Sequence, residues 1–287
     1  MTPKAEILVV IVMYNGMQWI EKCIGSVRAS SVPADIIVID NGSTDGSVAW
    51  LRRSGVELFL CPDNPGFGAA NNIGFKTALE RGYSYVYLLN QDAWVFPDCF
   101  GRLVDAFRRA PAFGILSPVQ YDGSGVQLDG NFSRHCAKQL QEGRPNPDEV
   151  KFVMAAHWML TAECIRATGG FSPAFHQYGE DDNYISRARR FGFLTGVVRD
   201  AGAVHDRARR KTGRKQKTML KCIASIKKVC DPDRPAVLSL ALELMHLAAM
   251  GVYRTSTLPW RSAVQLCRRF PFLKSCRKAS LEKGAFL

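Results

Sequence analysis

The stretch Leu88-Leu89-Asn90-Gln91-Asp92 decides the fold of this chain. An apolar run that starts at Tyr85 ends here in two amides and a carboxylate. Such a run is typical of a strand that is buried on both faces of a parallel sheet. Open α/β sheets bind their ligands beyond the carboxyl ends of the strands, so Asp92 is a candidate group for a metal ion or a phosphate. A plain turn also explains these residues, because Asp and Asn often end strands.

Three earlier segments repeat this pattern of an apolar strand, a polar turn and a helix. The strands are predicted at 7–13, 36–39 and 56–60, and the helices at 19–29, 44–53 and up to residue 81. Strands that alternate with helices at this spacing predict an α/β fold with a parallel sheet and right-handed crossovers.

The turns after these strands all lie at one edge of such a sheet, where they would form a nucleotide-sized cleft. Asp40 ends the second strand and can accept a hydrogen bond from a base imide or a ribose hydroxyl. Gly66, Gly68 and the two alanines that follow allow a diphosphate to approach the backbone closely. Asn-Gly and Pro-Gly pairs also form ordinary turns, which is the simpler explanation of each turn taken alone. The glycine patterns of NAD-binding and P-loop proteins are missing from these turns.

The second half of the chain contains a cluster of three acids at the start of a predicted helix. A helix is predicted at 99–109, a strand at 113–118, and a loop with one hairpin over 120–150. Glu180-Asp181-Asp182 follows an aromatic, Gly-bearing loop and precedes a helix predicted at 183–191. The acids can stabilise the helix dipole, and in this setting one of them can also serve as a general base. A last strand, predicted at 194–198, leads to His205.

The cationic residues are concentrated at the C-terminal end. Residues 1–205 contain 19 Lys and Arg against 21 Asp and Glu, and residues 206–287 contain 19 against 5, so the net charges are −2 and +14. The nine cysteines form no Cys-x-x-Cys pair and the start shows no secretory signal, which indicates reduced thiols and a cytoplasmic protein.

Together these motifs resemble glycosyltransferase family 2, whose members are inverting enzymes with the GT-A fold. The resemblance covers roughly residues 5–206 and is closest to bacterial enzymes of surface-polysaccharide synthesis, including rhamnosyltransferase-like members. It rests on the stretches VVIVMYNG, VIDNGSTDGS, NPGFGAANNIGF, LLNQDAWV and GGFSPAFHQYGEDDNYISRARRFGF, followed by His205. It implies a mostly parallel, Rossmann-like sheet flanked by helices as a catalytic domain at 1–205, followed by a basic helical region at 206–287.

The resemblance also implies roles for individual residues. Asp181 matches the catalytic base and Glu180 stands beside it, while Asn183 replaces a further acid that the family often has. Asp92 matches the last acid of the Asp-x-Asp metal motif, but Asn90 replaces the first, which puts the affinity for Mg²⁺ or Mn²⁺ in doubt; His205 would complete the metal site. The residues expected to bind the nucleotide sugar are Tyr14, Asn15, Asp40, Asn41, Asn64, Gly68, Asn72, Asn90 and Gln91.

The expected reaction moves a sugar from a UDP- or dTDP-linked donor, with rhamnose among the candidates, to a hydroxyl of a lipid-linked glycan. A metal ion would offset the charge on the leaving diphosphate while Asp181 takes the acceptor proton, so that one displacement inverts the anomeric centre. Two alternatives stay open here: a sugar nucleotidyltransferase, and a nucleotide-sugar-binding partner subunit with little activity of its own. The sequence also leaves an oligomer possible.

The basic region is expected to contact an anionic membrane surface or the diphosphate of a polyprenyl-linked acceptor at the inner face of the cytoplasmic membrane. Its cationic run at 206–228 lacks the aromatic residues that stack on bases, which argues against nucleic acid. Residues 236–253 are apolar, with Ser239, Glu243 and His246 along one helical face. Such a helix packs on the catalytic domain, pairs with a partner or lies in the membrane interface.

Overall fold

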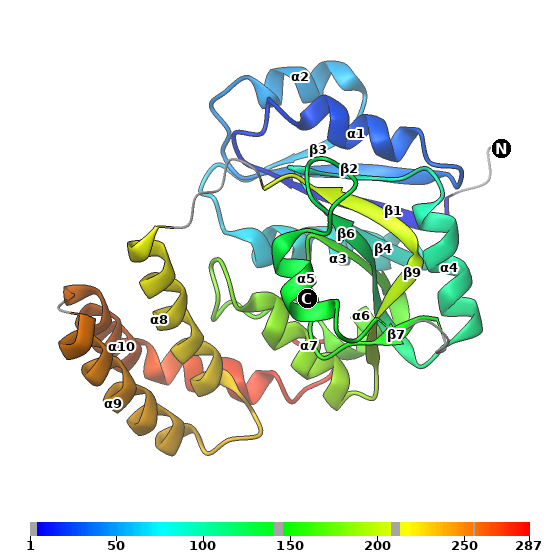
Figure 1. The fold of residues 1–287 in the computed structure, drawn as a ribbon. Helices are drawn as coiled ribbons and strands as arrows, with labels where there is room; N and C mark the ends of the chain where they lie inside the picture. The colour runs from blue at the N-terminus through cyan, green and yellow to red at the C-terminus, as the bar shows by residue number, and fades with distance from the viewer. Residues whose placement is uncertain (1–4, 141–145, 208–212, 255) are drawn as a thin grey trace.

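The computed structural model describes residues 5–140, 146–207, 213–254 and 256–287. In this part of the chain nine strands form one sheet between layers of helices, and three C-terminal helices form a lobe beside it (Figure 1). The strands are β1 (Ile7–Met13), β2 (Ala34–Asp40), β3 (Glu57–Leu60), β4 (Tyr85–Asn90), β5 (Ala93–Val95), β6 (Phe113–Tyr121), β7 (Asp148–Glu149), β8 (His157–Thr161) and β9 (Leu194–His205). The helices are α1 (Ile20–Arg28), α2 (Ser47–Ser54), α3 (Phe67–Arg81), α4 (Cys99–Arg109), α5 (Gly130–Cys136), α6 (Ala162–Thr168), α7 (Glu180–Arg190), α8 (Arg214–Cys230), α9 (Ala236–Arg254) and α10 (Thr257–Ala279).

The sheet is mixed, with the order β3-β2-β1-β4-β8-β6-β9-β5, and β7 pairs with β9. The first four strands in this order are parallel, as the sequence predicts. β8 lies between β4 and β6 and runs antiparallel to both of them. β6 and β9 pair in parallel, so the mostly parallel sheet that was expected is confirmed, with β8, β5 and β7 as its antiparallel strands.

Residues of β1 alternate between the two apolar layers that hold the sheet. Leu8 and Val10 pack with residues of α3, α6 and α7, whereas Ile7, Val9 and Ile11 pack with residues of α1 and α4. All five side chains are fully buried, which explains the continuous apolar run of this strand.

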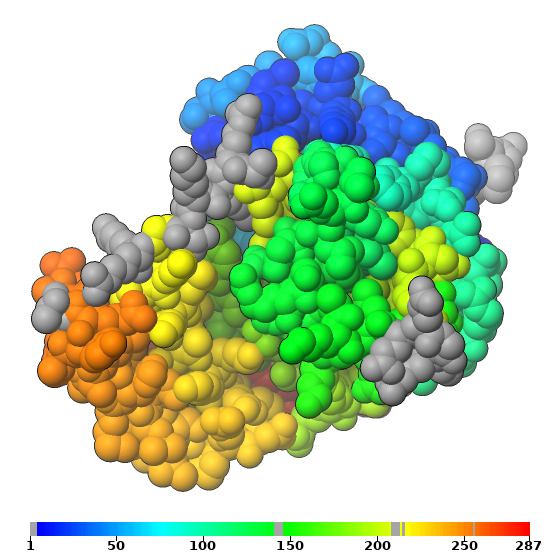
Figure 2. All heavy atoms as spheres, in the orientation of Figure 1, coloured from blue at the N-terminus to red at the C-terminus, as the bar shows by residue number. Residues whose placement is uncertain are grey.

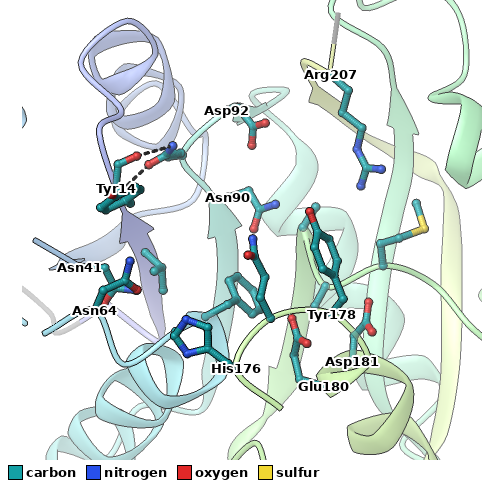
Figure 3. A pocket seen from close by; sticks show the side chains of 18 of the residues that line it. Tyr14, Asn41, Asn64, Asn90, Asp92, His176, Tyr178, Glu180, Asp181 and Arg207 are labelled. Carbon is teal, nitrogen blue, oxygen red and sulfur yellow. Dashed lines mark hydrogen bonds between the residues drawn. The ribbon is translucent and has the colours of Figure 1, made fainter. Parts of the chain in front are cut away.

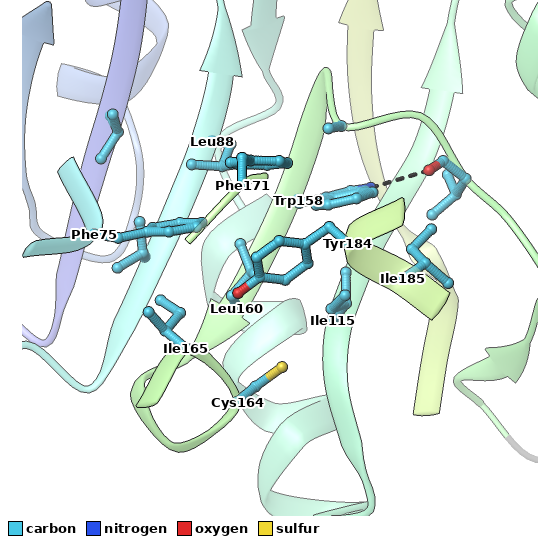
Figure 4. Packing of buried hydrophobic residues seen from close by; sticks show 14 of the residues in the cluster. Phe75, Leu88, Ile115, Trp158, Leu160, Cys164, Ile165, Phe171, Tyr184 and Ile185 are labelled. Carbon is cyan, nitrogen blue, oxygen red and sulfur yellow. Dashed lines mark hydrogen bonds between the residues drawn. The ribbon is translucent and has the colours of Figure 1, made fainter. Parts of the chain in front are cut away.

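An aromatic cluster anchors the acid-motif loop, residues 169–179, which leads to the acid motif Glu180-Asp181-Asp182 at the start of α7 (Figure 4). The ring of Phe171 stacks on that of Phe75 at 5.6 Å between centroids and lies 4.9 Å from that of Tyr184. Trp158 of β8 packs on the same cluster. Because these rings come from α3, β8, the loop and α7, they fix α7 against the sheet.

Two short elements and several boundaries differ from the sequence predictions. The segment 120–150, expected to be a loop with a hairpin, contains α5 and β7. Asp129 begins α5 as its N-cap, since its side chain accepts from the backbone N–H groups of Asn131 and Phe132. α6 was not predicted, α7 begins three residues before the expected start, and β9 continues seven residues beyond the expected end.

The C-terminal lobe lies against the sheet domain (Figure 2). The two share an apolar core. Cys222, Leu247 and Leu273, one from each of α8, α9 and α10, pack together with Phe175 of the acid-motif loop. The backbone N–H of Gly170 donates to the carbonyl of Ala285 at 2.7 Å, so the end of the chain is also held against the sheet domain.

Candidate functional site

The carboxyl ends of β1, β2 and β4 open into a cavity of about 560 Å³, which the start of α7 and two residues after β9 close on the other side (Figure 3). Backbone hydrogen bonds continue from the strands into the turns, from Asn41 to Met13 at 2.7 Å and from Cys61 to Asp40 at 2.7 Å. The turns are therefore held at one edge of the sheet, as the sequence predicts.

Hydrogen bonds tie together the turns after β1, β2 and β4 at one end of the cavity. The backbone N–H of Tyr14 donates to Oε1 of Gln91 at 2.7 Å, and Nε2 of Gln91 donates back to the Tyr14 carbonyl at 3.0 Å. The backbone N–H of Asn15 donates to Oγ of Ser43 at 2.9 Å, and Oδ1 of Asn15 accepts from the backbone of Thr44 at 2.8 Å. Tyr14 itself is half-exposed and lines the cavity, which leaves its ring free to contact a planar base.

Asp40 holds the backbone of the turn that follows β2. Its Oδ1 accepts from the backbone N–H groups of Gly42 at 3.1 Å and Ser43 at 2.9 Å. Oδ2 of Asp40 and Oδ1 of Asn41 are buried and make no hydrogen bond within the described residues. Asn41 lines the cavity, whereas Asp40 lies behind the lining. Both oxygens are acceptors that a bound nucleoside could satisfy.

Three residues in and after the turn that follows β3 were predicted to bind the nucleotide sugar, and only one of them lines the cavity. Asn64 lines the cavity with its backbone in the left-handed region, at φ 45°. Gly68 lies outside the lining, where a Cβ would come within 2.8 Å of the Cβ of Phe171. Asn72 also lies outside it, and its amide donates to the carbonyl of Phe171 at 3.0 Å and accepts from the same residue's N–H at 2.6 Å. Gly68 and Asn72 therefore hold the acid-motif loop, and their contact with a donor stays a prediction.

Asp92 and His205 meet because β5 and β9 pair in antiparallel register. Ala93 lies opposite His205, and the backbone N–H of Asp206 donates to the carbonyl of Asp92 at 2.9 Å. The buried His205 Nε2 lies 3.4 Å from Oδ1 of Asp92 and 3.5 Å from Nδ2 of Asn90. The pair that the resemblance implies as metal ligands is therefore brought together.

Few side chains that could ligate a metal ion surround Asp92 and His205. No group of three or more His, Cys, Asp or Glu side chains within the described residues could hold a metal ion. One carboxylate and one imidazole fit a hard divalent ion only if diphosphate oxygens and water complete the shell, which is how Mg²⁺ is usually bound. The guanidinium Nε of Arg207 donates to Nδ1 of His205 at 3.2 Å, so in the neutral ring the proton sits on Nε2 and would have to leave before Nε2 could ligate.

A second histidine lies behind this pair and is structural. His157 is fully buried, with Nδ1 2.8 Å from the hydroxyl of Tyr87 and Nε2 3.0 Å from the carbonyl of Val204. Burial, followed by the proximity of His205, lowers the pKa of His157 to about 3. The ring is therefore neutral, and its Nε2–H donates to the carbonyl.

Glu180 and Asp181 line the opposite wall at the first turn of α7. Gly179 and Tyr178 precede them in the left-handed region, at φ 90° and 70°, which turns the chain sharply into the helix. Burial, with repulsion from the carboxylates of Glu180 and Asp182 added to it, raises the pKa of Asp181 to about 7. Burial also raises the pKa of Glu180. A carboxyl that titrates near neutral pH suits a general base.

Several residues that the sequence did not single out also line the cavity. His176 and Tyr178 come from the acid-motif loop, while Arg207 and Leu220 come from the basic region. The aromatic loop was visible in the sequence, but no local pattern separates Arg207 from the cations that follow it. The basic region therefore contributes to the cavity wall as well as to the lobe.

The model of the family described as glycosyl transferase family 2 matches residues 8–161, which is more than half of the chain. The chain belongs to glycosyl transferase family 2. It is a glycosyltransferase, and the matched residues include the turns after β1, β2, β3 and β4. Glu180, Asp181 and His205 lie beyond the match. The assignment of Glu180 and Asp181 therefore depends on their place in the cavity lining, and that of the buried His205 on its proximity to Asp92.

One curated relative and two solved structures show how far the likeness extends. N-acetylglucosaminyl-diphospho-decaprenol L-rhamnosyltransferase of Mycobacterium tuberculosis is 25% identical over 241 residues, covering 72% of this chain and 77% of the relative. GalNAc-T7 with UDP, GalNAc and Mn²⁺ superposes with a TM-score of 0.59 at 16% identity, over 79% of this chain and 48% of that chain. S. aureus TarS 1–349 with UDP superposes with a TM-score of 0.57 at 11% identity, over 96% of this chain and 80% of that chain.

The chain thus spans about half the length of GalNAc-T7. At these identities the two structures show the fold alone, and that fold is the GT-A fold expected from the sequence.

Proposed function

We propose that this chain transfers a sugar from a nucleoside-diphosphate donor to a hydroxyl of a polyprenyl-diphosphate-linked glycan, with inversion at the anomeric carbon. The donor is UDP- or dTDP-linked, with rhamnose among the candidate sugars. The reaction would serve the synthesis of a bacterial surface polysaccharide, such as an O-antigen or a capsule, at the inner face of the cytoplasmic membrane.

The observation that carries this proposal is that one cavity joins two opposed sets of groups. On one wall stand the turn residues Asn41 and Asn64 with Asp92, and on the other stands Asp181 with its pKa raised to about 7. A donor diphosphate on the first wall would expose the anomeric carbon to an acceptor hydroxyl beside the second. An inverting displacement needs this placement, because the nucleophile must enter opposite the leaving group.

Asp181 acts as the base in this reaction. It accepts the proton of the acceptor hydroxyl while the hydroxyl oxygen forms a bond to the anomeric carbon. The bond from that carbon to the diphosphate oxygen breaks in the same step, and the electron pair leaves with the nucleoside diphosphate. No residue of the protein becomes bonded to the sugar.

Asp92 and His205 would hold a divalent ion against the donor diphosphate, because they are the carboxylate and the imidazole that lie within 3.4 Å of each other. Such an ion, when bound, offsets the negative charge of the leaving group. Arg207 lines the same cavity and adds a fixed positive charge. The structure of GalNAc-T7 was solved with Mn²⁺ together with UDP, which supports a divalent ion for this fold.

The relative from Mycobacterium tuberculosis supports the acceptor class. Its name states that it adds L-rhamnose to N-acetylglucosaminyl-diphospho-decaprenol, and it matches 72% of this chain. We extend to this chain the polyprenyl-diphosphate-linked acceptor, and we place the catalytic part at 1–205 and the membrane-facing part at 206–287.

The proposal is tested by incubating the purified protein with UDP-, dTDP- and GDP-sugars and a short-chain polyprenyl-diphosphate N-acetylglucosamine, with and without Mn²⁺. Mass spectrometry would detect the product, and NMR would assign its anomeric configuration. We expect one pyrimidine-linked donor to give a product of inverted configuration. A product of retained configuration would contradict the mechanism.

Asn90 keeps one alternative open, since a neutral amide stands where the family has an acid. A binding subunit would take up a pyrimidine nucleoside diphosphate and transfer nothing in the same assay. Membership of a glycosyltransferase family speaks against the other alternative, a sugar nucleotidyltransferase.

A further inference from the structure

Helix α9 exposes its apolar face. Six large apolar side chains on this face are 49% to 88% exposed: Val237, Leu238, Leu242, Met245, Val252 and Tyr253. At 100° per residue they fall on one side of the helix, together with Ala241 and Ala249, which are also exposed. That side carries no charged residue. An apolar face this continuous is unusual on a soluble protein and marks an interaction surface.

The opposite side of α9 faces inward, and there Leu247 and Met250 pack in the core of the lobe beside two buried polar residues. Ser239 and Glu243 are buried, at 6% and 5% exposure. Oγ of Ser225 on α8 donates to Oε2 of Glu243 at 2.8 Å, and Nζ of Lys228 lies 2.7 Å from Oε1. Of the polar stripe seen in the sequence, Glu243 thus fastens α9 to α8, whereas His246 is exposed. The inward contact fixes which side of α9 is presented outward.

We propose that the outward face of α9 binds the surface of an anionic lipid bilayer, with the helix lying in the interface parallel to the membrane. This deepens the proposed function, on which it rests, by naming the surface that meets the membrane. Interfacial helices of this kind combine an apolar face with nearby cations.

The positive charge of residues 206–287 favours an anionic membrane over a second copy of the chain as the partner of the outward face of α9. Residues 206–287 have a net charge of +14, which attracts anionic headgroups. On the neighbouring α10, Trp260, Val264 and Phe272 are about half-exposed, and Arg261 and Arg268 between them are exposed as well. A second copy of the chain would bring two such regions together, and their repulsion would oppose a dimer.

Helix α9 is long and apolar enough to span a membrane by length and composition, with a third of its apolar window buried. Spanning would require α9 to leave α8 and to carry Glu243 into the hydrocarbon without Lys228. Lying flat preserves that contact and still buries the six exposed side chains. Figure 2 shows α9, in orange, at the outer side of the lobe, away from the sheet domain.

The surface is linked to the cavity through α8. Leu220 of α8 lines the cavity, while Lys228 of the same helix is paired with α9. A bilayer against α9 would therefore lie near the cavity wall that the basic region supplies. The lipid anchor of a polyprenyl-linked acceptor would be held in the same bilayer.

The test is co-sedimentation of the full chain with vesicles of phosphatidylcholine containing about 30% phosphatidylglycerol, an anionic surface of the kind that attracts cationic segments. The variant Leu238→Ser/Met245→Ser/Val252→Ser removes three large apolar groups from the face. The control Leu60→Ser/Val126→Ser removes exposed apolar groups from the sheet domain, where the wild-type side chains are 50% and 78% exposed. Unchanged binding of UDP or dTDP would show that each variant is folded.

We expect the wild type and the control to bind these vesicles, and the α9 variant to bind at least about tenfold more weakly, since binding scales with the apolar area that enters the interface. Because the chain already has five Trp, Tyr253→Trp is compared with the wild type. The emission that the substitution adds should shift to the blue on binding and be quenched by brominated lipid. Equal vesicle binding by the α9 variant and the wild type would overturn the proposal. A stable dimer in light scattering that the α9 variant abolishes would also overturn it, in favour of a second copy as the occupant.

These measurements are independent of catalysis. Binding to vesicles without sugar transfer would contradict the proposed function and leave the membrane surface intact. Sugar transfer without any binding to vesicles would support the proposed function and contradict the membrane surface.

Discussion

Lys227 of α8 lies 2.5 Å from Oδ1 of Asp182, the residue that follows Asp181 on α7. The carboxylate of Asp182 helps to raise the pKa of Asp181 through charge repulsion, which adds to the larger effect of burial. A cation held beside Asp182 offsets that repulsion. The C-terminal lobe therefore takes part in the electrostatics of the proposed base, in addition to supplying part of the cavity wall.

Opposite shifts in the pH profile should follow from removing the two partners of this ion pair. Lys227→Met removes a positive charge, so Asp181 should hold its proton more tightly and the acidic limb of kcat/KM should move to higher pH. Asp182→Asn removes a negative charge and should move the limb to lower pH. Each shift should be a few tenths of a pH unit, because the two side chains are 40% and 35% exposed and water screens them.

The exposed cation Lys274 of α10 provides the control for this pair. Lys274→Met should leave the pH profile unchanged. Shifts of the same sign for Lys227→Met and Asp182→Asn would contradict the role assigned to the pair.

The raised pKa of Asp181 also has a consequence for stability. Below about pH 4 the carboxyl is protonated in the folded and the unfolded chain, so it does not affect folding. Between that pH and about 7 the unfolded chain loses the proton first, so stability falls as the pH rises, and above about 7 the loss is complete. Asp181→Asn removes this loss of stability. The melting temperature of the variant minus that of the wild type should therefore be larger at about pH 8 than at about pH 4.5.

Thermal unfolding at the two pH values measures this difference. The half-exposed Asp122, which caps the turn at Ser124, gives a matched control, since Asp122→Asn should show no gain at the higher pH. An Asp181→Asn variant that is relatively less stable at the higher pH than at the lower would mean that the carboxyl is not held in its protonated form by the fold.

Asn90 should limit the affinity for a divalent ion. Asn90→Asp adds a carboxylate beside Asp92, so Mn²⁺ binding in the presence of UDP should tighten by about tenfold, while Asp92→Asn should weaken it. Electron paramagnetic resonance of bound Mn²⁺ measures the affinity without any turnover. Asn131→Asp adds the same charge elsewhere on the cavity lining, and an equal gain there would indicate a general charge effect.

The close approach of two loops at Gly66 should make this position intolerant of a side chain. Gly66 has φ 92°, and a Cβ there would collide with the carbonyl oxygen of His176. Gly192 has φ 90° with nothing within 4 Å, so Gly192→Ala should lower stability only by the cost of the left-handed backbone, about 1–2 kcal/mol. Gly66→Ala should lower it by more and should weaken nucleotide binding. Equal melting temperatures for the two variants would show that the loops can move apart.

The parts of the fold that local sequence determines were predictable. The buried run of β1 and the polar tips of β2 and β4 identify a parallel sheet and its ligand edge, because strand burial and turn chemistry leave direct traces in the sequence. The direction of β8 was not predictable, since its register, with Leu88 opposite Trp158, is set by the pairing of distant strands.

The candidate site divides in the same way. Asp92, Asp181 and the turn residues that line the cavity stand where strands and helices begin or end, and sequence reasoning singled them out. Leu220 reaches the cavity because the C-terminal lobe folds back onto the sheet domain, and Arg207 reaches it because the end of β9 pairs with β5 next to Asp92. Asn72 holds residues that lie 99 and 214 positions away, which no local pattern encodes.

The most direct test of the account is the rate of sugar transfer by Asp181→Asn, compared with its affinity for the donor nucleotide. A base that removes the acceptor proton contributes about 10²- to 10⁴-fold to the rate, so kcat should fall by that factor while nucleotide affinity stays within about twofold. Glu180→Gln, on the same turn of α7, should lose less. Transfer by Asp181→Asn at the wild-type rate would contradict the assignment of Asp181 as the base.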